Sequence, residues 1–357
     1  MAERVMMKGN EALAEGAVRA GCRFFFGYPI TPQNEIPEYM SRRLPEVGGT
    51  FLQAESEVSA INMCYGAGGA GARVMTSSSS PGVSLKQEGI SYCAGAEVPC
   101  VIANIQRGGP GLGGLTPSQS DYFQATKGGG HGDYHPIVLA PNSVQEMFDL
   151  AGLAFTLADR YRTQVIILAD AILGQMMEPV SLPSGEQAAP PDKPWATTGA
   201  AGRAPNLINS LGLPAEELLK INRRLQEKYR RIEAAEVRYE EDGVSGAEIV
   251  VVAYGTTSRV AKSAMEMLRA EGIRVGLFRP VTLWPFPSGA LAALAQAGKR
   301  FLVAEMSAGQ LVEDVRLAAA GRAPVDLFAK LNGSIPASRE IYEAVKALAA
   351  VPKGGAA

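Results

Sequence analysis

The chain has 357 residues, of which 46% are hydrophobic and 20% are charged, and its formal net charge is −2. A pI of about 5.9 gives no electrostatic reason to expect nucleic acid as a partner. The length predicts roughly two domains, and no run of about 18 apolar residues suggests a membrane span. Charges interrupt residues 1–16 where a signal peptide needs an apolar segment, so we expect a cytoplasmic protein.

Helix and strand patterns alternate from residue 10 to about 170. The predicted strand at 99–105 is apolar throughout, as expected where helices cover both faces of a sheet. Repeated βα units of this length predict a doubly wound parallel sheet. Helices are predicted at 10–20, after Pro32, and at 55–65, 81–94 and 143–158, and strands at 22–26, 50–53, 73–76, 99–105, 137–139 and 164–168.

The pattern changes at residues 178–213, which are rich in proline and glycine and lack periodic apolar positions, so composition favours a linker. A polar amphipathic helix is predicted at 214–240, where it crosses a surface or touches a partner chain. A second α/β unit follows, with strands at 248–255, 273–280 and 300–306 and helices at 256–272 and 309–320. We therefore predict an α/β protein with two doubly wound parallel-sheet domains, 1–180 and 247–357, joined by an irregular segment and connecting helix at 181–246.

The stretch GYPITP, residues 27–32, connects an aromatic strand with the next helix. Gly27 lets the backbone turn, and Pro29 and Pro32 stiffen the connection around Thr31. Open α/β sheets place ligands at strand ends of this kind, next to helix N-termini. An ordinary strand-to-helix connection explains the local sequence equally well.

Glu57 lies at the start of the next predicted helix, whose other positions are mostly apolar. A carboxylate at a helix N-terminus is most often a partner of the helix dipole or a cap. The functional alternative is a partly buried acid that donates to, or shares a proton with, a ring nitrogen. The sequence around Glu57 supports both interpretations.

Two further loops are predicted at the same edge of the sheet. Residues 77–82, SSSSPG, supply hydroxyls and amides at a helix start, and Arg107 opens the loop RGGPGLGG. We expect the glycines to leave the Arg107 guanidinium accessible for a bidentate contact with a carboxylate, although a solvated loop charge is the commoner case. The convergence of Thr31, Glu57, these serines and Arg107 on one edge favours a binding site.

The segment GAGGAG, residues 66–71, matches the glycine spacing of a dinucleotide-binding loop. That loop requires a strand before the glycines and a helix after them, whereas here a helix precedes and a strand follows. We therefore predict close helix–sheet packing and a helix C-cap, and we disfavour an NAD-dependent oxidoreductase.

The cysteines and histidines give no metal-binding pattern. The cysteines are widely spaced and lack a CxxC pair, which predicts isolated core thiols: Cys22, Cys64, Cys93 and Cys100. His131, in a glycine-rich stretch, suits either an acid–base role or a bond to the backbone.

Several of these segments occur in the same order as in the α subunits of 2-oxoacid:ferredoxin oxidoreductases: GYPITPQNEIPEYM, QAESEV, MTSSSSPGVSLKQEGI, NIQRGGPG and GGHGDY. The sequence most resembles the 2-oxoisovalerate, or branched-chain, type, and the match extends to AYGTTSR and RPVTLWPFP in the second unit. The resemblance implies a thiamine-diphosphate pyrimidine-binding domain followed by a transketolase C-terminal-like domain. It also implies CoA-dependent oxidative decarboxylation of a 2-oxoacid to acyl-CoA and CO₂, with reduction of ferredoxin.

The same resemblance implies roles for individual residues. Glu57 matches the glutamate that contacts the ring nitrogen of the cofactor, and its proton stabilises the form of the ring that activates the thiazolium carbon. Thr31 and Arg107 match the residues that hold the substrate carboxylate. The cofactor-binding residues implied are Tyr28, Pro29, Ile30, Glu57, Ser78 and Ser79.

The sequence lacks the GDG segment with its distant asparagine that holds magnesium and diphosphate in thiamine enzymes. The resemblance therefore implies that a β subunit binds the diphosphate and Mg²⁺, and that [4Fe-4S] clusters lie on partner subunits. A γ subunit, a ferredoxin-like δ subunit and ferredoxin complete the implied electron route, with coenzyme A as co-substrate. The same reaction on 2-oxoglutarate or pyruvate, or a non-catalytic scaffold, remains the alternative.

Overall fold

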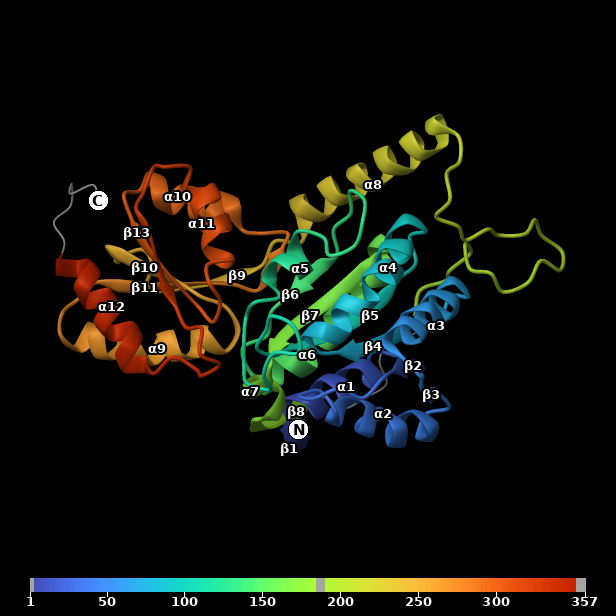
Figure 1. Cartoon of the computed structure of the whole chain (residues 1–357), viewed down its shortest axis with the longest axis horizontal. Helices are drawn as coiled ribbons and strands as arrows, with labels where there is room; N and C mark the ends of the chain where they lie inside the picture. Colours follow the sequence, from blue (N-terminus) through green and yellow to red (C-terminus); the bar gives the residue numbers. More distant parts are fainter. Residues whose placement is uncertain (1–2, 184–189, 351–357) are drawn as a thin grey trace.

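The chain folds into two parallel-sheet units that lie side by side, with the N-terminal unit in blue to green and the C-terminal unit in orange to red (Figure 1). The computed structural model describes residues 3–183 and 190–350. No helix within these residues combines the length and apolar character that a membrane crossing requires.

The first unit contains a seven-stranded sheet with the order β12-β6-β7-β5-β4-β2-β3. All neighbours pair in parallel except β12, and both central strands, β5 and β7, are buried along their whole length, as predicted from the apolar run at 99–105. The strands are β2 (Phe24–Gly27), β3 (Thr50–Gln53), β4 (Val74–Ser78), β5 (Cys100–Gln106), β6 (Ile137–Leu139), β7 (Gln164–Asp170) and β12 (Thr282–Trp284).

Helices cover this sheet in two groups, in which α1 packs against α2 and α6, and α3 packs against α4. The doubly wound architecture predicted from the alternating pattern is confirmed. The helices are α1 (Gly9–Arg19), α2 (Glu35–Glu46), α3 (Glu57–Gly69), α4 (Ser80–Gly95), α5 (Tyr122–Thr126), α6 (Val144–Tyr161) and α7 (Ala171–Gln175). All four cysteines are buried free thiols, in agreement with their predicted place in the core.

A two-stranded ribbon, β1 (Glu3–Lys8) with β8 (Met177–Leu182), was not predicted. The predicted irregular segment starts at residue 178, but its first residues form β8. Each strand alone is short and carries charges, so the pairing depends on a partner about 170 residues away in the sequence. The part of the predicted linker at 184–189 lies outside the described residues, and 190–213 contain neither helix nor strand.

The second unit contains a five-stranded sheet with the order β14-β13-β10-β11-β9. All pairs are parallel except that of β9 with β11. The strands are β9 (Tyr239–Asp242), β10 (Ile249–Val252), β11 (Val275–Pro280), β13 (Arg300–Glu305) and β14 (Val325–Ala329), and the helices are α9 (Gly255–Ala270), α10 (Ser288–Gln296), α11 (Leu311–Ala319) and α12 (Ser338–Ala350).

The connecting helix α8 spans Ala215–Ala235 and crosses the top of the first unit in Figure 1. The predicted helix at 214–240 is therefore too long, because residues from Tyr239 onward form β9 on the edge of the second sheet. The charged run YEED has no apolar period that distinguishes a last helical turn from an edge strand. Pairing with β11 decides between the two.

Short elements of each part of the chain reach into the other. β12 comes from the C-terminal part but pairs with β6 of the first sheet, and β9 follows the connecting helix but pairs in the second sheet. Trp284 of β12 stacks on His135 at a ring distance of 4.8 Å, and Tyr229 of α8 meets Trp284 edge-on at 5.7 Å. The domain limits at 180/181 and 246/247 stay a prediction.

The glycines of GAGGAG are packed closely, as predicted from the order of the helix and the strand. Gly68 lies where a Cβ would come within 2.8 Å of the Pro99 carbonyl oxygen, and Gly71 has φ +91° just after the end of α3. Gly69 and Gly71 also face Ile208 and Ala196 of the 190–213 segment. These glycines end a helix and allow close approach, so they form no nucleotide loop.

Candidate functional site

Four loops meet at the carboxyl edge of the first sheet, where β5, β4, β2 and β3 are consecutive neighbours. The GYPITP loop follows β2, α3 follows β3, the serine run ends β4, and Arg107 follows β5. Hydrogen bonds connect these loops, since Arg107 donates to the Thr31 carbonyl and Ser77 bonds to Gln33. The convergence predicted from the sequence is therefore present.

The GYPITP loop presents its side chains outward from a buried base. Tyr28, Pro29 and Thr31 are exposed and Ile30 is half-buried. Gln33 beneath them is fully buried, and its amide donates to the Tyr28 carbonyl over 3.3 Å. The sequence reasoning missed Gln33, whose signal was a polar residue among loop prolines.

Glu57 occupies the first position of α3, directly after the N-cap residue Ser56, whose hydroxyl accepts from the Ser59 amide. The cap role considered for Glu57 is thus filled by Ser56. Glu57 is 6% exposed, and no donor in the described part of the chain bonds to its carboxylate. A buried carboxylate without a protein partner is costly and is typical of groups that bind a ligand.

The Glu57 carboxylate packs closely against Gly82 of α4. A Cβ at Gly82 would lie 2.6 Å from Glu57 Oε1 and 2.2 Å from Ser78 Oγ. The carboxylate and the Ser78 hydroxyl therefore lie side by side against the backbone of α4. Only a residue without a side chain allows this close approach.

Two serine hydroxyls at the end of β4 are buried without partners. Ser78 and Ser79 are both fully buried, and neither Oγ forms a hydrogen bond within residues 3–183 and 190–350. Leaving a buried hydroxyl unsatisfied costs about 1–3 kcal/mol. With Glu57, they form a group of buried polar side chains that lack hydrogen-bonding partners.

Ser80, in contrast, belongs to a satisfied network that the sequence reasoning missed. Its hydroxyl donates to Asp121 Oδ2 over 2.6 Å, Asn104 Nδ2 donates to the same oxygen over 2.9 Å, and Ser80 has φ +20°. Burial raises the pKa of the Asp121 carboxyl, although the bonds from Ser80 and Asn104 oppose the shift. This network fixes the strained turn between β4 and α4.

Arg107 is not accessible, so the expectation based on its glycine-rich loop is wrong. Its side chain is 5% exposed because the loop folds back over it, and it donates to the carbonyls of Thr31 over 2.9 Å and Leu112 over 3.1 Å. Its Nε is buried and has no partner among the described residues. Arg107 thus joins two site loops and retains one buried donor.

His131 lies apart from these contacts. Its ring is exposed and has no hydrogen-bond partner in the described part of the chain, while its carbonyl accepts from Ser91 over 2.7 Å. The second histidine, His135, is packed between aromatic rings, and burial lowers its pKa. Neither geometry adds a catalytic group to the edge described above.

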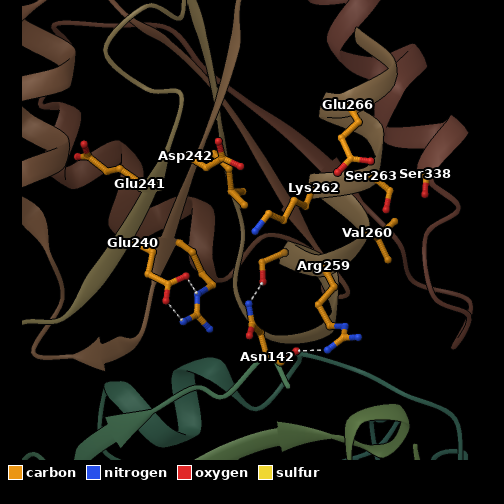
Figure 2. Close-up of a pocket in the computed structure, with 13 residues that line it drawn as sticks. Asn142, Glu240, Glu241, Asp242, Arg259, Val260, Lys262, Ser263, Glu266 and Ser338 are labelled. Carbon is orange, nitrogen blue, oxygen red and sulfur yellow. Dashed lines mark hydrogen bonds and ion pairs between the residues drawn. The ribbon is translucent and has the colours of Figure 1, made fainter. Parts of the chain in front are cut away.

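Two larger cavities are lined by residues of both units. One of about 790 Å³ adjoins the site edge and is lined by Ser80, Asp121 and residues of the second unit, including Ser307 and Lys330. The other, of about 740 Å³, lies between β9, α9 and Asn142 (Figure 2).

The charges of the cavity in Figure 2 are largely paired. The buried Arg279 bonds to Glu146 and Glu240, and Arg259 bonds to Glu178 and to the Asn142 carbonyl. These pairs connect the two units. No predicted site residue lines this cavity.

Comparison with known families shows the family of this chain. Residues 15–241 match the thiamine diphosphate-binding model of pyruvate flavodoxin/ferredoxin oxidoreductases, and residues 247–341 match core domain II of pyruvate:ferredoxin oxidoreductase. The chain belongs to the 2-oxoacid:ferredoxin oxidoreductase subunit family.

Individual relatives support this membership. Ketoisovalerate oxidoreductase subunit VorB of Methanothermobacter thermautotrophicus is 55% identical over 344 residues, which cover 96% of this chain and 97% of the relative. The 2-oxoglutarate synthase subunit KorA of Methanocaldococcus jannaschii is 39% identical over 363 residues, 95% of this chain and 98% of that one. The chain is therefore an oxidoreductase subunit, as the sequence resemblance implied.

Solved structures agree in fold. A 2-oxoglutarate:ferredoxin oxidoreductase from Magnetococcus marinus, solved with 2-oxoglutarate, coenzyme A and succinyl-CoA bound, matches with a TM-score of 0.87 and 28% identity. The match covers 97% of this chain but only 65% of that longer chain. A split-gene transketolase matches with a TM-score of 0.60 at 14% identity, over 96% of this chain and 97% of that one, and supports the fold alone.

The residues at the site edge fit the polar side of the cofactor that the family binds. An aminopyrimidine ring carries both hydrogen-bond donors and acceptors. The open carboxylate of Glu57 and the unpartnered hydroxyls of Ser78 and Ser79 supply the complementary groups beside Gly82.

Proposed function

We propose that this chain supplies the pyrimidine side of a thiamine-diphosphate site in a complex that converts a branched-chain 2-oxoacid and coenzyme A to acyl-CoA and CO₂, with reduction of ferredoxin. One observation carries the proposal for the site: Glu57, Ser78 and Ser79 are buried polar groups without hydrogen-bonding partners in the described residues, gathered at the ends of β4 and β3. The preference for a branched-chain substrate rests on the 55% identical relative, which is a ketoisovalerate oxidoreductase subunit.

Each residue has a defined task in this proposal. Glu57 holds a proton between its carboxylate and the ring nitrogen of the cofactor, and Ser78 and Ser79 complete the polar contacts. Tyr28, Pro29 and Ile30 present the outer wall beside the ring. When bound, thiamine diphosphate supplies a nucleophilic carbon and an electron sink for decarboxylation.

Substrate orientation is assigned to Thr31 and Arg107. The Thr31 side chain is exposed at the loop, and its only hydrogen bond in the described residues is a long one of 3.5 Å from Asn34. Arg107 lies directly behind this residue through its bond to the Thr31 carbonyl, and its Nε–H is free to donate. Because Arg107 is buried, its positive charge acts on a substrate carboxylate at low local dielectric.

The proposed complex includes a β subunit that binds the diphosphate and Mg²⁺, because the sequence lacks a segment of that kind. We further propose that [4Fe-4S] clusters lie on partner subunits, with γ and ferredoxin-like δ subunits in the assembly. The four cysteines of this chain are buried free thiols, and no three His, Cys, Asp or Glu side chains of the described residues form a group that could hold a metal ion, which supports a cluster location outside this chain.

The test is a reductive assay of the co-expressed complex with coenzyme A, a low-potential acceptor and a panel of 2-oxoacids. We expect the highest kcat/KM with 2-oxoisovalerate, and a preference for 2-oxoglutarate or pyruvate would replace the substrate assignment. Glu57→Gln is expected to remove turnover with every substrate, whereas the exposed neighbour Glu55 provides a matched control as Glu55→Gln.

A scaffold subunit makes the opposite prediction. If the catalytic groups lie wholly on other chains, the complex with Glu57→Gln keeps wild-type turnover and wild-type affinity for thiamine diphosphate. Calorimetric titration of the cofactor-depleted complex measures that affinity independently of turnover. Unchanged values in both measurements would refute the proposed site.

A further inference from the structure

The face of α4 that packs against α3 carries two glycines and one lysine at helical spacing: Gly82, Lys86 and Gly89. A Cβ at Gly89 would come within 2.5 Å of Ile61, and one at Gly82 would meet the Glu57 carboxylate. The two helices are therefore in close contact on both sides of Lys86. The lysine is the single charged group of this stripe.

Lys86 is fully buried, which is rare for a lysine. Its Nζ donates to Thr76 Oγ1 of β4 over 3.1 Å and to the carbonyl of Glu57 over 3.4 Å. No carboxylate in the described residues lies within ion-pair distance of it. Burying an ammonium group without a paired anion costs free energy, so a hydrophobic residue of similar length would serve packing better.

The groups that act on Lys86 point to Glu57. Burial lowers the pKa of Lys86, while Cys64, Glu57 and Cys100 oppose that shift, and Glu57 is the carboxylate among them. The hydrogen bond reaches the backbone of the same residue. The Lys86 ammonium thus contacts the Glu57 carbonyl directly and acts on the Glu57 carboxylate through its charge.

We propose that Lys86 is a positioning residue for Glu57: it ties the first turn of α3 to β4 and α4 and so holds the Glu57 carboxylate beside Ser78, where the cofactor is proposed to bind. Glu57 stands at the first position of its helix, where the backbone is held by fewer intrahelical bonds than in the interior. A bond to its carbonyl fixes the backbone from which the Glu57 side chain projects. The inference rests on the proposed function of Glu57 and adds a residue to it.

The experiment compares Lys86→Met, which removes charge and donor, with Lys86→Gln, which keeps a donor. Lys228→Met is the matched control, because Lys228 is also a buried lysine, 3% exposed, but bonds to Glu97 and the Arg162 carbonyl. All variants are made in the co-expressed complex. The readouts are the Kd of thiamine diphosphate by calorimetry, kcat, and the KM of the 2-oxoacid.

We expect Lys86→Met to weaken cofactor binding and to lower kcat by about ten-fold each, with little change in the KM of the 2-oxoacid, because a misplaced carboxylate affects the cofactor first. Lys86→Gln recovers part of both losses. Lys228→Met lowers the unfolding midpoint but leaves Kd and kcat at wild-type values. A Lys86→Met complex with wild-type Kd and kcat would overturn the proposal.

A double-mutant cycle shows whether Lys86 acts through Glu57. In the Glu57→Gln background, Lys86→Met should produce no further loss of cofactor affinity, and additive losses would contradict a shared role. If Lys86→Met does not assemble, Thr76→Val takes its place, since it removes the hydroxyl that anchors Lys86 and predicts a smaller loss in the same direction. If Glu57→Gln itself keeps full affinity and turnover, the proposed function fails, whatever Lys86 does.

Discussion

Each sheet carries a buried glutamate at its carboxyl edge, and the two differ in what surrounds them. Glu305, at the end of β13, is fully buried and accepts hydrogen bonds from the amides of Gln310, Leu311 and Val312 and from the Ser307 hydroxyl. Glu57, in the first sheet unit, is buried to a similar degree but has no donor in the described residues for its carboxylate.

The difference distinguishes a structural carboxylate from the one that we propose binds a ligand. Glu305 fills its acceptor capacity with the N-terminus of α11, so it stabilises the fold and has nothing left for a ligand. Glu57 leaves the capping of α3 to Ser56 and stands next to two unsatisfied hydroxyls. Burial alone does not identify a functional acid, because Glu305 is buried and fully hydrogen-bonded. A buried acid without hydrogen-bonding partners is the better candidate for binding a ligand.

The largest effect is expected for Glu57→Ala. Turnover of the complex should fall by about 10²–10⁴-fold, since a positioned acid–base group contributes that much. The unfolding midpoint should not fall, because no protein hydrogen bond to the side chain is lost. Turnover assays and thermal unfolding of the same complex measure both, and a large loss of stability would make Glu57 resemble Glu305.

Glu305→Ala should show the reverse behaviour. The change leaves several buried donors unpaired and is expected to lower the free energy of unfolding by about 3 kcal/mol, measured by chemical denaturation. Glu313→Ala, at an exposed position in the first turn of the same helix, is the control and should cost less than about 1 kcal/mol. Wild-type stability of Glu305→Ala would remove the contrast between the two glutamates.

Gly82→Ala tests the close packing beside Glu57 without replacing a polar residue. The added methyl group would overlap Ser78 Oγ and Glu57 Oε1, so we expect the Kd of thiamine diphosphate to rise by about ten-fold, the equivalent of a modest overpacking cost. Gly66→Ala is the control, because nothing lies within 4 Å of its Cβ position. That control should leave Kd unchanged and stabilise α3 by up to about 1 kcal/mol.

The smallest effect concerns a partly buried carboxylate, Glu97, which is paired with basic residues of α8. Burial acts to raise the pKa of Glu97, but Lys228, Arg224 and Arg162 outweigh it and hold that pKa below its ordinary value of 4.5. The carboxylate therefore contributes stability above about pH 4.5, and this contribution is lost as the pH falls through the lowered pKa.

The stability difference between wild type and Glu97→Gln, on the order of 1 kcal/mol near neutral pH, should shrink in acid. Denaturation curves at several pH values below 5 measure it. A difference that stays constant down to pH 3 would show that the charges around Glu97 do not govern its contribution.

Much of the fold follows from sequence periodicity. The strands at Thr50–Gln53 and Ile137–Leu139 match their predicted limits, and the alternation of elements predicts both parallel sheets. Several elements were missed: α10, β14 and α12 of the second unit were not predicted, β1 and β8 pair only with each other, and β9 is a charged strand at a sheet edge. The pairing energy of β1, β8 and β9 comes from distant partners, so no local pattern marks these three strands.

The candidate site also has features that the sequence predicts and features that it does not. Strand ends followed by glycine, proline, serine and a carboxylate indicate where Thr31, Glu57, Ser78 and Arg107 converge. The sequence does not indicate that Arg107 is buried, that Ser80 is satisfied while Ser78 is not, or that Lys86 lies under Glu57. Each of these facts depends on how two loops or helices pack against each other.

The sequence by itself therefore determined the fold class, the convergence of the candidate site residues on one edge of the sheet, and the family, because periodicity and motif order are local properties of the chain. Tertiary structure alone decided which of the polar groups remain without partners. Hydrogen-bond satisfaction depends on distances between segments that are remote in sequence, and it is this property that distinguishes Glu57 from Glu305.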